Sequence, residues 1–543
     1  MPKFLIPLLA FALILGLTSS ATADETYFSF EIKSPAELET LTRVISIDNV
    51  TGNVVRAYAS DKELEAFRQL GYSFTILPHP GDVTEAGMSS SVKGAQLWDT
   101  YPTYEAYRAM MFQFAADYPD LCTVDSIGAS ILGRAILCAK ISDNAAIEEN
   151  EPEVLYTSSM HGDETTGYVL MLRLIDYLLS NHGSLSEVTT LVDNLEIWIN
   201  PLSNPDGTYY GGNSSVTGAR RYNANFVDLN RNFPDPQDGA HPDGHAWQPE
   251  TIVMMNFAAA HRFVLSANFH GGAEVVNYAW DTWPIRHADD AWYQDLSRDY
   301  ADLAQANSPP GYLTDLNNGI TNGWDWYTIN GGRQDYMNYW HGCRETTIEL
   351  SSTKLLPASL LPAYWDYNRE SFLDYLGKAL YGVKGTVTDA GTGDPLLAHV
   401  AVLNHDADSS GLYTDPDLGD YCRMLAPGVY DFEFSANGYV SQTILGVTVA
   451  DGQVTSLNVA LSTPPACICS HQGDAEPDGF ITALDLAELI DILFAGKFEA
   501  QDLECVTVRF DLDCDFFSTA LDLAVLIDHL YAGAPGPCDP CNP

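Results

Sequence analysis

The sequence has few basic residues, and this scarcity restricts its partners. Among 543 residues there are 26 Lys and Arg against 73 Asp and Glu, which gives a formal net charge of −47. A surface of this sign repels nucleic acid and anionic membranes, so the charge argues against both as partners. It fits a cation-rich extracellular setting or calcium sites, although a solvated acidic surface accounts for most of these charges.

Long apolar runs are also missing beyond the first residues. The run FLIPLLAFALILGL follows Lys3 and precedes small residues at Ala21 and Ala23. This order is typical of a secretory signal peptide over residues 1–23, cleaved after Ala23. A membrane anchor is the alternative, but the run is short for a span. We therefore expect a secreted, extracellular protein without a membrane span, either free or associated with the cell surface.

Cysteine is rare except near the C-terminus. Six of the ten cysteines fall within residues 466–543. They are Cys467, Cys469, Cys505, Cys514, Cys538 and Cys541. Their spacing does not match the usual zinc-finger patterns, so disulfides formed in an oxidising compartment are favoured over a zinc cluster. The sequence does not determine the pairing.

What the chain does contain is a succession of segments with different patterns. Residues 24–80 alternate as β-α-β-β-α-β, which predicts a small α+β, ferredoxin-like domain, either a propeptide or a permanent module. Residues 81–94 are a Gly- and Ser-rich linker and a candidate for proteolytic cleavage. Residues 95–378 mix apolar strands with helices and predict an α/β domain with a largely parallel or mixed sheet. Residues 379–462 read as short strands with Gly/Asp turns, which indicates an all-β sandwich.

The tail, residues 466–543, contains an internal duplication. DAEPDGFITALDLAELIDILFAG begins at Asp474 and DLDCDFFSTALDLAVLIDHLYAG at Asp511. In each copy an acidic loop with EF-hand-like spacing leads into an amphipathic helix, so two calcium ions are predicted. Phe516 stands where the second loop should have glycine, and this predicts a weaker site. The predicted calcium ligands are Asp474, Glu476, Asp478, Asp485, Asp511, Asp513, Asp515 and Asp522.

Chemically useful side chains gather at the ends of the strands predicted for residues 95–378. His161 and Glu164 follow the apolar run EVLYTSS, and His270 ends RFVLSANFH. Two histidines and a carboxylate are a usual ligand set for a catalytic zinc, with water at the fourth position. A single histidine here would more often be an ordinary hydrogen-bonding residue, so the prediction depends on the coincidence of all three.

Six ordered motifs carry a resemblance to a known family. HGDE, NPDG, DLNRNFPD, NFHGG, NGGRQDY and TIELSS occur in the order found in the zinc metallocarboxypeptidases of the carboxypeptidase A/B superfamily. The chain resembles most the branch that includes carboxypeptidases N, E, M and D. In that branch a transthyretin-like domain follows the catalytic one, which matches residues 379–462.

The resemblance implies a role for each matching residue. His161, Glu164 and His270 would bind zinc, and Glu349 would be the general base. Asp163 would orient a zinc ligand. Arg221 would stabilise the oxyanion, although Arg220 is an alternative. The residues implied to hold the C-terminal carboxylate of the substrate are Asn230, Arg231 and Tyr327.

The resemblance also suggests the preferred C-terminal residue of the substrate. Asp281 and Gln334 match pocket positions that favour Lys or Arg in that branch. Arg333 replaces the usual methionine and Arg286 is nearby in sequence, so either cation would weaken a preference for basic residues.

The duplicated tail resembles a type I dockerin, which implies a cohesin-type partner on a scaffold or cell surface. A self-contained, calcium-stabilised cap is the alternative. For the whole chain we expect a secreted zinc metallocarboxypeptidase that acts on the C-termini of peptides or proteins. The alternatives are a zinc amide hydrolase acting on cell-wall peptides or N-acyl amino acids, and an inactive calcium-dependent binding protein.

Overall fold

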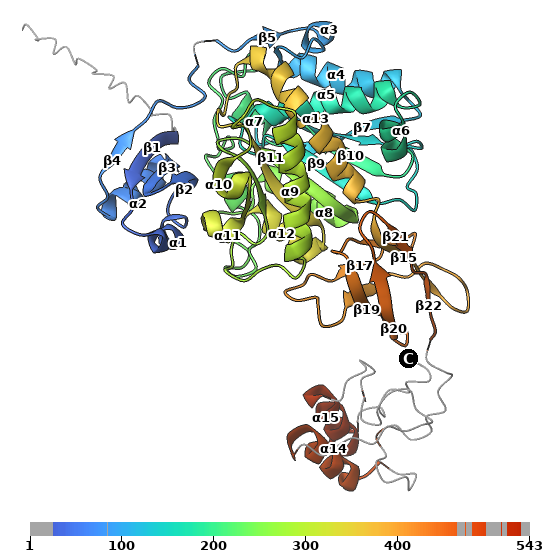
Figure 1. The fold of residues 1–543 in the computed structure, drawn as a ribbon. Helices are drawn as coiled ribbons and strands as arrows, with labels where there is room; N and C mark the ends of the chain where they lie inside the picture. Colours follow the sequence, from blue (N-terminus) through green and yellow to red (C-terminus); the bar gives the residue numbers. More distant parts are fainter. Residues whose placement is uncertain are drawn as a thin grey trace, which may run out of the picture.

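The computed structural model describes residues 25–83, 85–463, 473, 481–495, 512 and 519–533. An N-terminal domain, a central domain and a β-sandwich follow one another along the chain, and two helices belong to the tail (Figure 1). The predicted signal peptide lies outside the described residues, and so do the six clustered cysteines. Among the described helices, none combines the length and the hydropathy needed to cross a bilayer.

The N-terminal domain is an antiparallel sheet in the order β2-β3-β1-β4 with two helical segments. Helix α2 begins at Asp61 because Ser60 and Glu63 form a capping box. The first helical segment consists only of a 3-10 turn and one short helix. The elements are β1 (Glu25–Glu31), η1 (Pro35–Glu37), α1 (Leu38–Leu41), β2 (Ser46–Thr51), β3 (Val54–Ser60), α2 (Asp61–Gln69) and β4 (Phe74–Ile76).

The central domain is built on a sheet in the order β13-β12-β14-β11-β9-β10-β8-β7. Strands β14, β11, β9 and β10 run parallel to one another, whereas β12, β8 and β7 introduce antiparallel pairs. The prediction of an α/β domain with a mixed sheet is therefore confirmed. The strands are β7 (Cys122–Ala129), β8 (Ala135–Ile141), β9 (Glu153–Ser158), β10 (Glu196–Asn200), β11 (Phe263–His270), β12 (Glu274–Tyr278), β13 (Ile320–Asn322) and β14 (Arg344–Leu350).

Helices cover both faces of this sheet. One face packs against α4, α5, α9 and α13 around residues such as Tyr156 and Phe269, and the other against α8 and α12 around Leu155 and Met337. Two short strands, β5 (Met88–Ser89) and β6 (Tyr101–Pro102), pair outside the main sheet. The helices are α3 (Val92–Ala95), α4 (Tyr104–Asp117), α5 (Thr166–Asn181), α6 (Ser186–Val192), α7 (Pro205–Thr208), η2 (Leu229–Arg231), α8 (Pro249–Ala260), α9 (Asp290–Ala306), α10 (Asp315–Asn318), α11 (Gly323–Trp326), α12 (Arg333–His341), η3 (Ala358–Leu360) and α13 (Leu361–Lys378).

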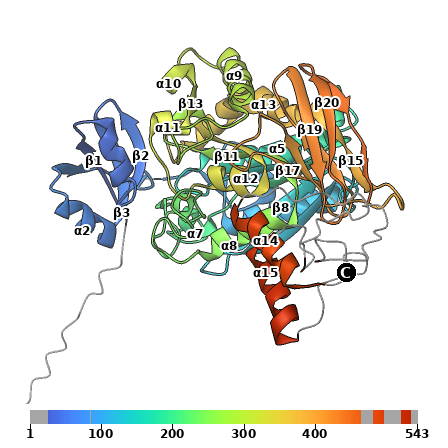
Figure 2. The same cartoon turned by 90° about the horizontal axis from the view of Figure 1, so that it is seen from below.

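The β-sandwich follows α13 and packs two small sheets around one apolar core, in agreement with the all-β prediction for this segment. One sheet has the order β18-β15-β21, with β22 also on β15, and the other has β17-β16-β19-β20. Figure 2 shows the sandwich and the N-terminal domain on different sides of the central domain. Its strands are β15 (Gly382–Asp389), β16 (His399–Val402), β17 (Leu412–Tyr413), β18 (Asp420–Arg423), β19 (Gly428–Ser435), β20 (Gln442–Val449), β21 (Val454–Ser456) and β22 (Val459–Leu461).

Two tail helices are described, α14 (Ala483–Ala495) and α15 (Ala520–Ile527), with a π-helical turn over Asp528–Ala532. Asp485 and Asp522 lie in the first turns of these helices and are buried. The other predicted calcium ligands, namely Asp474, Glu476, Asp478, Asp511, Asp513 and Asp515, lie outside the described residues. The two calcium loops therefore stay a prediction.

Candidate active site

The three predicted zinc ligands come from the ends of two neighbouring strands. His161 and Glu164 lie in the turn between β9 and α5, and His270 is the last residue of β11. Strands β9 and β11 are parallel and in register up to the pair Ser158 and Phe269. Their carboxyl ends therefore meet at the same edge of the sheet, where open α/β sheets place their sites.

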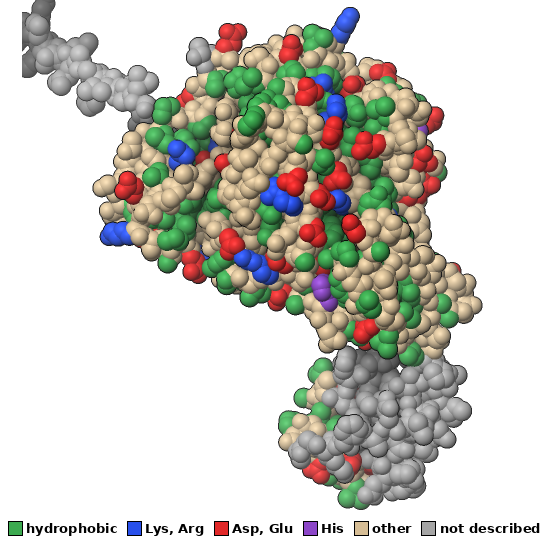
Figure 3. All heavy atoms as spheres, in the orientation of Figure 1, with side chains coloured by type: hydrophobic (Ala, Val, Ile, Leu, Met, Phe, Trp, Pro, Cys, Tyr) green, Lys and Arg blue, Asp and Glu red, His purple; other side chains and the backbone are tan. Residues whose placement is uncertain are grey.

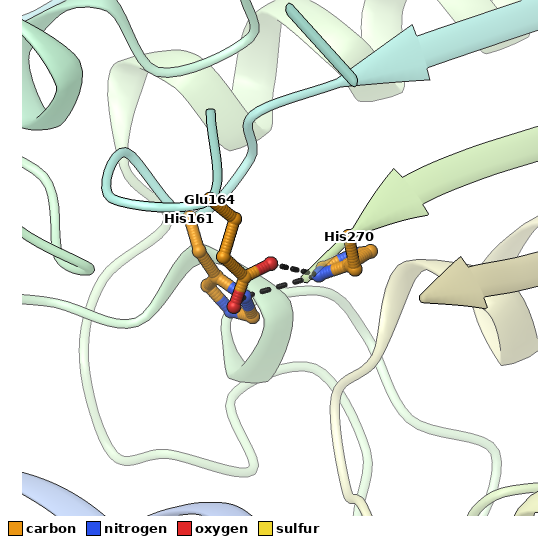
Figure 4. A group of neighbouring side chains, drawn as sticks. All are labelled: His161, Glu164 and His270. Atoms are coloured by element: carbon orange, nitrogen blue, oxygen red, sulfur yellow. Dashed lines mark hydrogen bonds and ion pairs between the residues drawn. The ribbon is translucent and has the colours of Figure 1, made fainter. Parts of the chain in front are cut away.

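The side chains of these residues converge on one point (Figure 4). His161 Nδ1 lies 2.9 Å from Glu164 Oε1, and His270 Nδ1 lies 2.8 Å from Glu164 Oε2. The two Nδ1 atoms are 3.1 Å apart. Two imidazole nitrogens and a carboxylate that face one another, each residue only 3% exposed, form a donor set suited to a zinc ion.

A buried acid fixes the orientation of His161. Its Nε2 lies 3.0 Å from Asp228 Oδ1, which leaves Nδ1 to face Glu164 and His270. This carboxylate–histidine pairing is typical around metal ligands. The prediction that Asp163 would orient a ligand is wrong, because its Oδ2 accepts from Tyr58 Oη at 2.7 Å and its Oδ1 has no hydrogen-bond partner among the described residues. Asp228 begins the motif DLNRNF, and only the fold shows that it contacts His161.

Glu349 lies on β14, next to His270 in the parallel pairing of β11 and β14. It is 8% exposed, and its Oε2 has no hydrogen-bond partner among the described residues. Burial raises the pKa of the Glu349 carboxyl well above its usual range, and the nearby charge of Glu164 raises this pKa further. A carboxyl group with a raised pKa beside a metal centre is suited to accept and return a proton.

Two adjacent arginines in the sequence have different surroundings. Arg221 is 2% exposed, and its Nη1 and Nε lie 3.1 Å from Glu164 Oε1 and Asp228 Oδ2, respectively. Arg220 instead pairs with Asp82 at 2.9 Å, away from these residues. The structure therefore brings Arg221, and not Arg220, next to the predicted zinc ligands.

The residues predicted to hold a substrate carboxylate surround one small cavity. Asn230 and Arg231 come from η2, and Tyr327 directly follows α11. The cavity is about 10 Å³, which is room for about one water molecule. Its lining includes His161, Glu164, Arg221, Asn230, Arg231, His270, Asn277, Tyr327, Thr347 and Glu349, together with Asp48 of the N-terminal domain.

Asp48 and Lys354 are site residues that the sequence did not reveal. Asp48 Oδ1 lies 2.6 Å from Lys354 Nζ and 3.5 Å from Arg221 Nη1. Lys354 Nζ also lies 2.6 Å from Glu164 Oε1 and donates to the carbonyl of Gly271 at 2.8 Å. Lys354 follows the TIELSS motif by only a few residues, and this proximity is the feature of the sequence that could have indicated its place in the site. No comparable signal marked Asp48.

The predicted specificity residues form a connected group beside this cavity. Gln334 Nε2 donates to Asp281 Oδ1 at 3.3 Å, and Asn277 Nδ2 donates to the same oxygen at 2.9 Å. Gln334 Oε1 accepts from the amide of Thr347, which lines the cavity. Burial raises the pKa of Asp281 to about 6. Hydrogen bonds from two side-chain amides thus hold the carboxylate of Asp281 in place, but they compensate its negative charge only in part.

The two cations expected to weaken a basic preference have other partners. Arg333 is fully buried, and its guanidinium pairs with Glu345 at 2.8 Å on the side of α12 that faces the sheet. Arg286 pairs with Asp325 at 2.6 Å. Neither residue lines the cavity. The expectation that they oppose Asp281 is therefore wrong.

Comparison with known proteins supports these assignments of fold. Residues 107–371 match the model described as zinc carboxypeptidase, and residues 382–462 match the carboxypeptidase regulatory-like domain. The chain is 39% identical to carboxypeptidase D of Mus musculus over 368 residues, which covers 64% of this chain and 26% of that protein. It is 34% identical to the carboxypeptidase N catalytic chain of Homo sapiens over 399 residues, which covers 66% of this chain and 85% of that protein.

The chain spans about a quarter of the length of the carboxypeptidase D relatives that it matches. Among solved structures, carboxypeptidase A from Helicoverpa armigera aligns with a TM-score of 0.51 at 19% identity, covering 66% of this chain and 98% of that chain. At this identity the match is one of fold alone.

Proposed function

Because the chain belongs to the zinc carboxypeptidase family, we propose that it is a secreted zinc metallocarboxypeptidase. It removes the C-terminal residue of peptides or proteins by hydrolysing the last peptide bond. The convergence of His161, Glu164 and His270 beside Glu349 and Arg221 is the observation that carries this proposal.

The chemistry is divided among the side chains around the small cavity. Zinc, when bound by the two histidines and Glu164, would polarise the scissile carbonyl and acidify a water molecule. Glu349 takes a proton from the attacking water and returns it to the nitrogen of the leaving amine as the C–N bond breaks. Arg221 carries a permanent positive charge and stabilises the negative charge that develops on the carbonyl oxygen.

The choice of a terminal bond is assigned to Asn230, Arg231 and Tyr327. The guanidinium of Arg231 matches a carboxylate in shape and charge, and Asn230 and Tyr327 add further donors. A peptide without a free C-terminal carboxylate would leave these buried groups unpaired, which costs binding free energy. Exopeptidase action is thereby favoured over internal cleavage.

The experiment compares Glu349→Gln with Glu187→Gln, a matched change on the exposed part of α6. Metal content is measured by mass spectrometry. The release of amino acids is measured with three substrates, namely peptides with a free C-terminus, amidated peptides and N-acyl amino acids. Both measurements are made before and after proteolysis within residues 81–94. We expect Glu349→Gln to retain zinc and lose turnover, while the control keeps both. Unchanged turnover in Glu349→Gln would refute the assigned base, and hydrolysis of N-acyl amino acids alone would refute the peptidase assignment.

A preference for C-terminal Lys or Arg follows from the surroundings of Asp281. Its carboxylate is buried beside the cavity, and the two nearby arginines are paired elsewhere. A cationic substrate side chain would supply the missing counter-charge. The preference is tested by kcat/KM for peptides that end in Lys, Arg, Phe and Leu. Faster cleavage of the Phe and Leu peptides would contradict it.

The N-terminal domain is proposed to be an inhibitory propeptide. Strand β2 delivers Asp48 to Lys354 and Arg221, and the carbonyl of Ile47 accepts from Arg231 Nη2 at 3.0 Å. The proposed carboxylate-binding arginine is therefore occupied by main chain of this domain. With about 10 Å³ left between these groups, a peptide can enter only if the domain moves away.

Limited proteolysis within residues 81–94 tests the propeptide assignment. Removal of residues 24–80 from the cleaved chain should raise kcat/KM for a short peptide by at least about 100-fold, since the site passes from closed to open. Adding the purified N-terminal fragment back should restore inhibition. Equal activity of the uncleaved and cleaved chains would show that this domain is a permanent module.

The tail is proposed to bind two calcium ions and to dock to a cohesin-type partner, and residues 1–23 are proposed to direct secretion. The support is the repeated acidic loop followed by a helix, with Asp485 and Asp522 buried at equivalent places. Calorimetry should show two fewer calcium ions bound by the double variant Asp485→Asn/Asp522→Asn than by the wild type. An unchanged count would refute the tail sites.

A further inference from the structure

The loop between β8 and β9 gathers carboxylates at the edge of the sheet opposite the zinc ligands. It precedes Glu153, the first residue of β9, whereas His161 follows the last. A strand of this length separates the two ends by about 20 Å. Asp143, Glu149 and Glu151 of this loop are half-buried, and one carboxylate oxygen from each lies within 4.8 Å of the other two.

Two positive side chains near this loop pair with acids other than Asp143, Glu149 and Glu151. Lys140 Nζ lies 2.8 Å from Glu196 Oε1 and also donates to the carbonyl of Ile147 in the loop, and His182 pairs with Asp193 at 2.7 Å. Within the loop, the amide of Asn144 donates to Glu149 Oε2 at 3.0 Å, which neutralises no charge. Carboxylates this close repel one another unless a cation lies among them.

Glu196 on β10 gives an independent indication. This residue is only 1% exposed, and its carboxylate reaches the loop, where Oε1 accepts from the amide of Glu149 at 2.9 Å. Its second oxygen, Oε2, is buried and has no partner among the described residues. Glu151 Oε2 is in the same situation. Buried oxygens are nearly always paired, so the unpaired oxygen of Glu151 and that of Glu196, whose carboxylate contacts the loop, indicate a missing ligand.

The electrostatics of the loop agree with this geometry. Burial, and then the charges of Asp143, Glu149 and Glu196, raises the pKa of Glu151 to about 7. The pKa of Asp143 is likewise raised, by burial and then by Glu149. In the absence of a cation, the loop would therefore be under charge repulsion near neutral pH.

We propose that Asp143, Glu149 and Glu151, with Glu196 behind them, bind one divalent cation of the calcium class. All of the donors are oxygens, which suits a hard cation and not zinc. The same loop borders a cavity of about 330 Å³ whose lining includes Asp415 and Asp420 of the β-sandwich region. A bound cation would reduce the repulsion between this loop and the sandwich, so the site would stabilise the junction of the two domains.

Equilibrium dialysis with radioactive calcium tests the site on the zinc-loaded full chain. The changes Asp485→Asn/Asp522→Asn serve as the background, because they remove the two calcium ions predicted for the tail. Any calcium that remains bound is then assigned to the loop between β8 and β9. We expect one calcium ion per chain in this background and none after the further changes Glu149→Gln/Glu151→Gln. The control change Glu187→Gln should keep the ion. Absence of bound calcium in the background, or its persistence after the two changes, would overturn the proposal.

Thermal melting distinguishes lost binding from lost folding. Without calcium, Glu149→Gln/Glu151→Gln should melt no lower than its parent, because it removes repulsion. Added calcium should raise the melting temperature of the parent and of the control variant but leave that of the double variant unchanged. Asp143→Asn, a milder change, should show a smaller calcium-dependent rise than the parent. An equal rise in all four proteins would overturn the proposal.

Discussion

The central domain has two buried, charged interfaces, and they differ in what their charges contact. The N-terminal domain meets it through Asp48, which pairs with Lys354 and lies near Arg221 at the proposed site. The β-sandwich contacts the central domain at Asp289, a residue of the central domain. The carboxylate of Asp289 accepts hydrogen bonds from Arg344 of the central domain and from Arg423 of the sandwich. No residue of this second group lines the catalytic cavity.

The two interfaces differ in how well the buried charges of the central domain would stay compensated if the contact were lost. Arg221 retains Glu164 and Asp228 as partners when Asp48 leaves, so the charged groups of the site stay compensated. Arg344 depends on Asp289 for its counter-charge, whereas Arg423 pairs with Asp289 and also with Asp406 at 2.6 Å. A buried charge that loses its partner is costly. Release of the N-terminal domain would therefore leave the buried charges of the site compensated, whereas separation of the β-sandwich would part Asp289 from Arg423, both of them buried. On the face drawn in Figure 3, acidic and basic side chains of the described residues are scattered, and no charged patch marks either interface.

Asp289→Ala should have the largest effect on stability. It would leave Arg344 and Arg423 buried with a lost counter-charge, and breaking such a pair typically costs about 3–5 kcal/mol. The free energy of unfolding is measured by urea denaturation of the zinc-loaded chain. Asp302→Ala removes an exposed acid from α9 and should change it by less than about 0.5 kcal/mol. A loss below about 1 kcal/mol for Asp289→Ala would remove the distinction between the interfaces.

Asp48→Asn should have a smaller effect, and it should appear in activity. The variant keeps the shape of the side chain but loses the charge that faces Lys354 and Arg221. Weakening closure by about 1.4 kcal/mol would raise the open fraction tenfold, so hydrolysis of a short peptide by the uncleaved chain should rise by about that factor.

The control for this prediction is Glu39→Gln, an exposed change in the same domain. It should leave the residual hydrolysis of the uncleaved chain unaltered. After removal of residues 24–80, all three proteins should have the same kcat/KM. A difference that persists after removal would mean that Asp48→Asn acts by something other than release of the site.

The sequence predicted the parts of the site that lie in short, ordered motifs. Each of the four residues His161, Glu164, His270 and Glu349 stands within, at the end of or shortly after an apolar run that forms an interior strand. Their position at one sheet edge therefore followed from the pattern. The family resemblance based on these motifs is confirmed. The α/β class and the following sandwich could be predicted for the same reason.

Contacts between distant segments could not be predicted. Asp48 and Lys354 are separated by most of the central domain in sequence, and only the docking of the N-terminal domain brings them together. Arg333 directly precedes Gln334 in the sequence, but consecutive helical residues point about 100° apart. Gln334 therefore faces Asp281, and Arg333 faces Glu345 of strand β14.

Asp420→Asn should have the smallest effect, and that effect should depend on pH. Burial, and then the charge of Asp415, raises the pKa of Asp420 to about 7, well above the value of an unfolded aspartate. The folded chain therefore holds a proton that the unfolded chain releases between about pH 4 and pH 7, so the free energy of unfolding falls as pH rises through this window. Removing the charge should stabilise the protein at pH 8.5 by on the order of 1 kcal/mol, since solvent and salt screen part of the full shift.

Urea denaturation at pH 5 and pH 8.5 measures this effect. The gain from Asp420→Asn should be present at pH 8.5 and much reduced at pH 5, where the wild-type carboxyl is already protonated in the folded state. Asp451→Asn, an exposed change near the same sandwich, should give no such difference. A gain of equal size at both pH values would mean that folding does not raise the pKa of Asp420. The stability of the junction between the central domain and the sandwich would then depend on Asp289 and its arginines. The acidic residues around the cavity of about 330 Å³ would make no contribution to it.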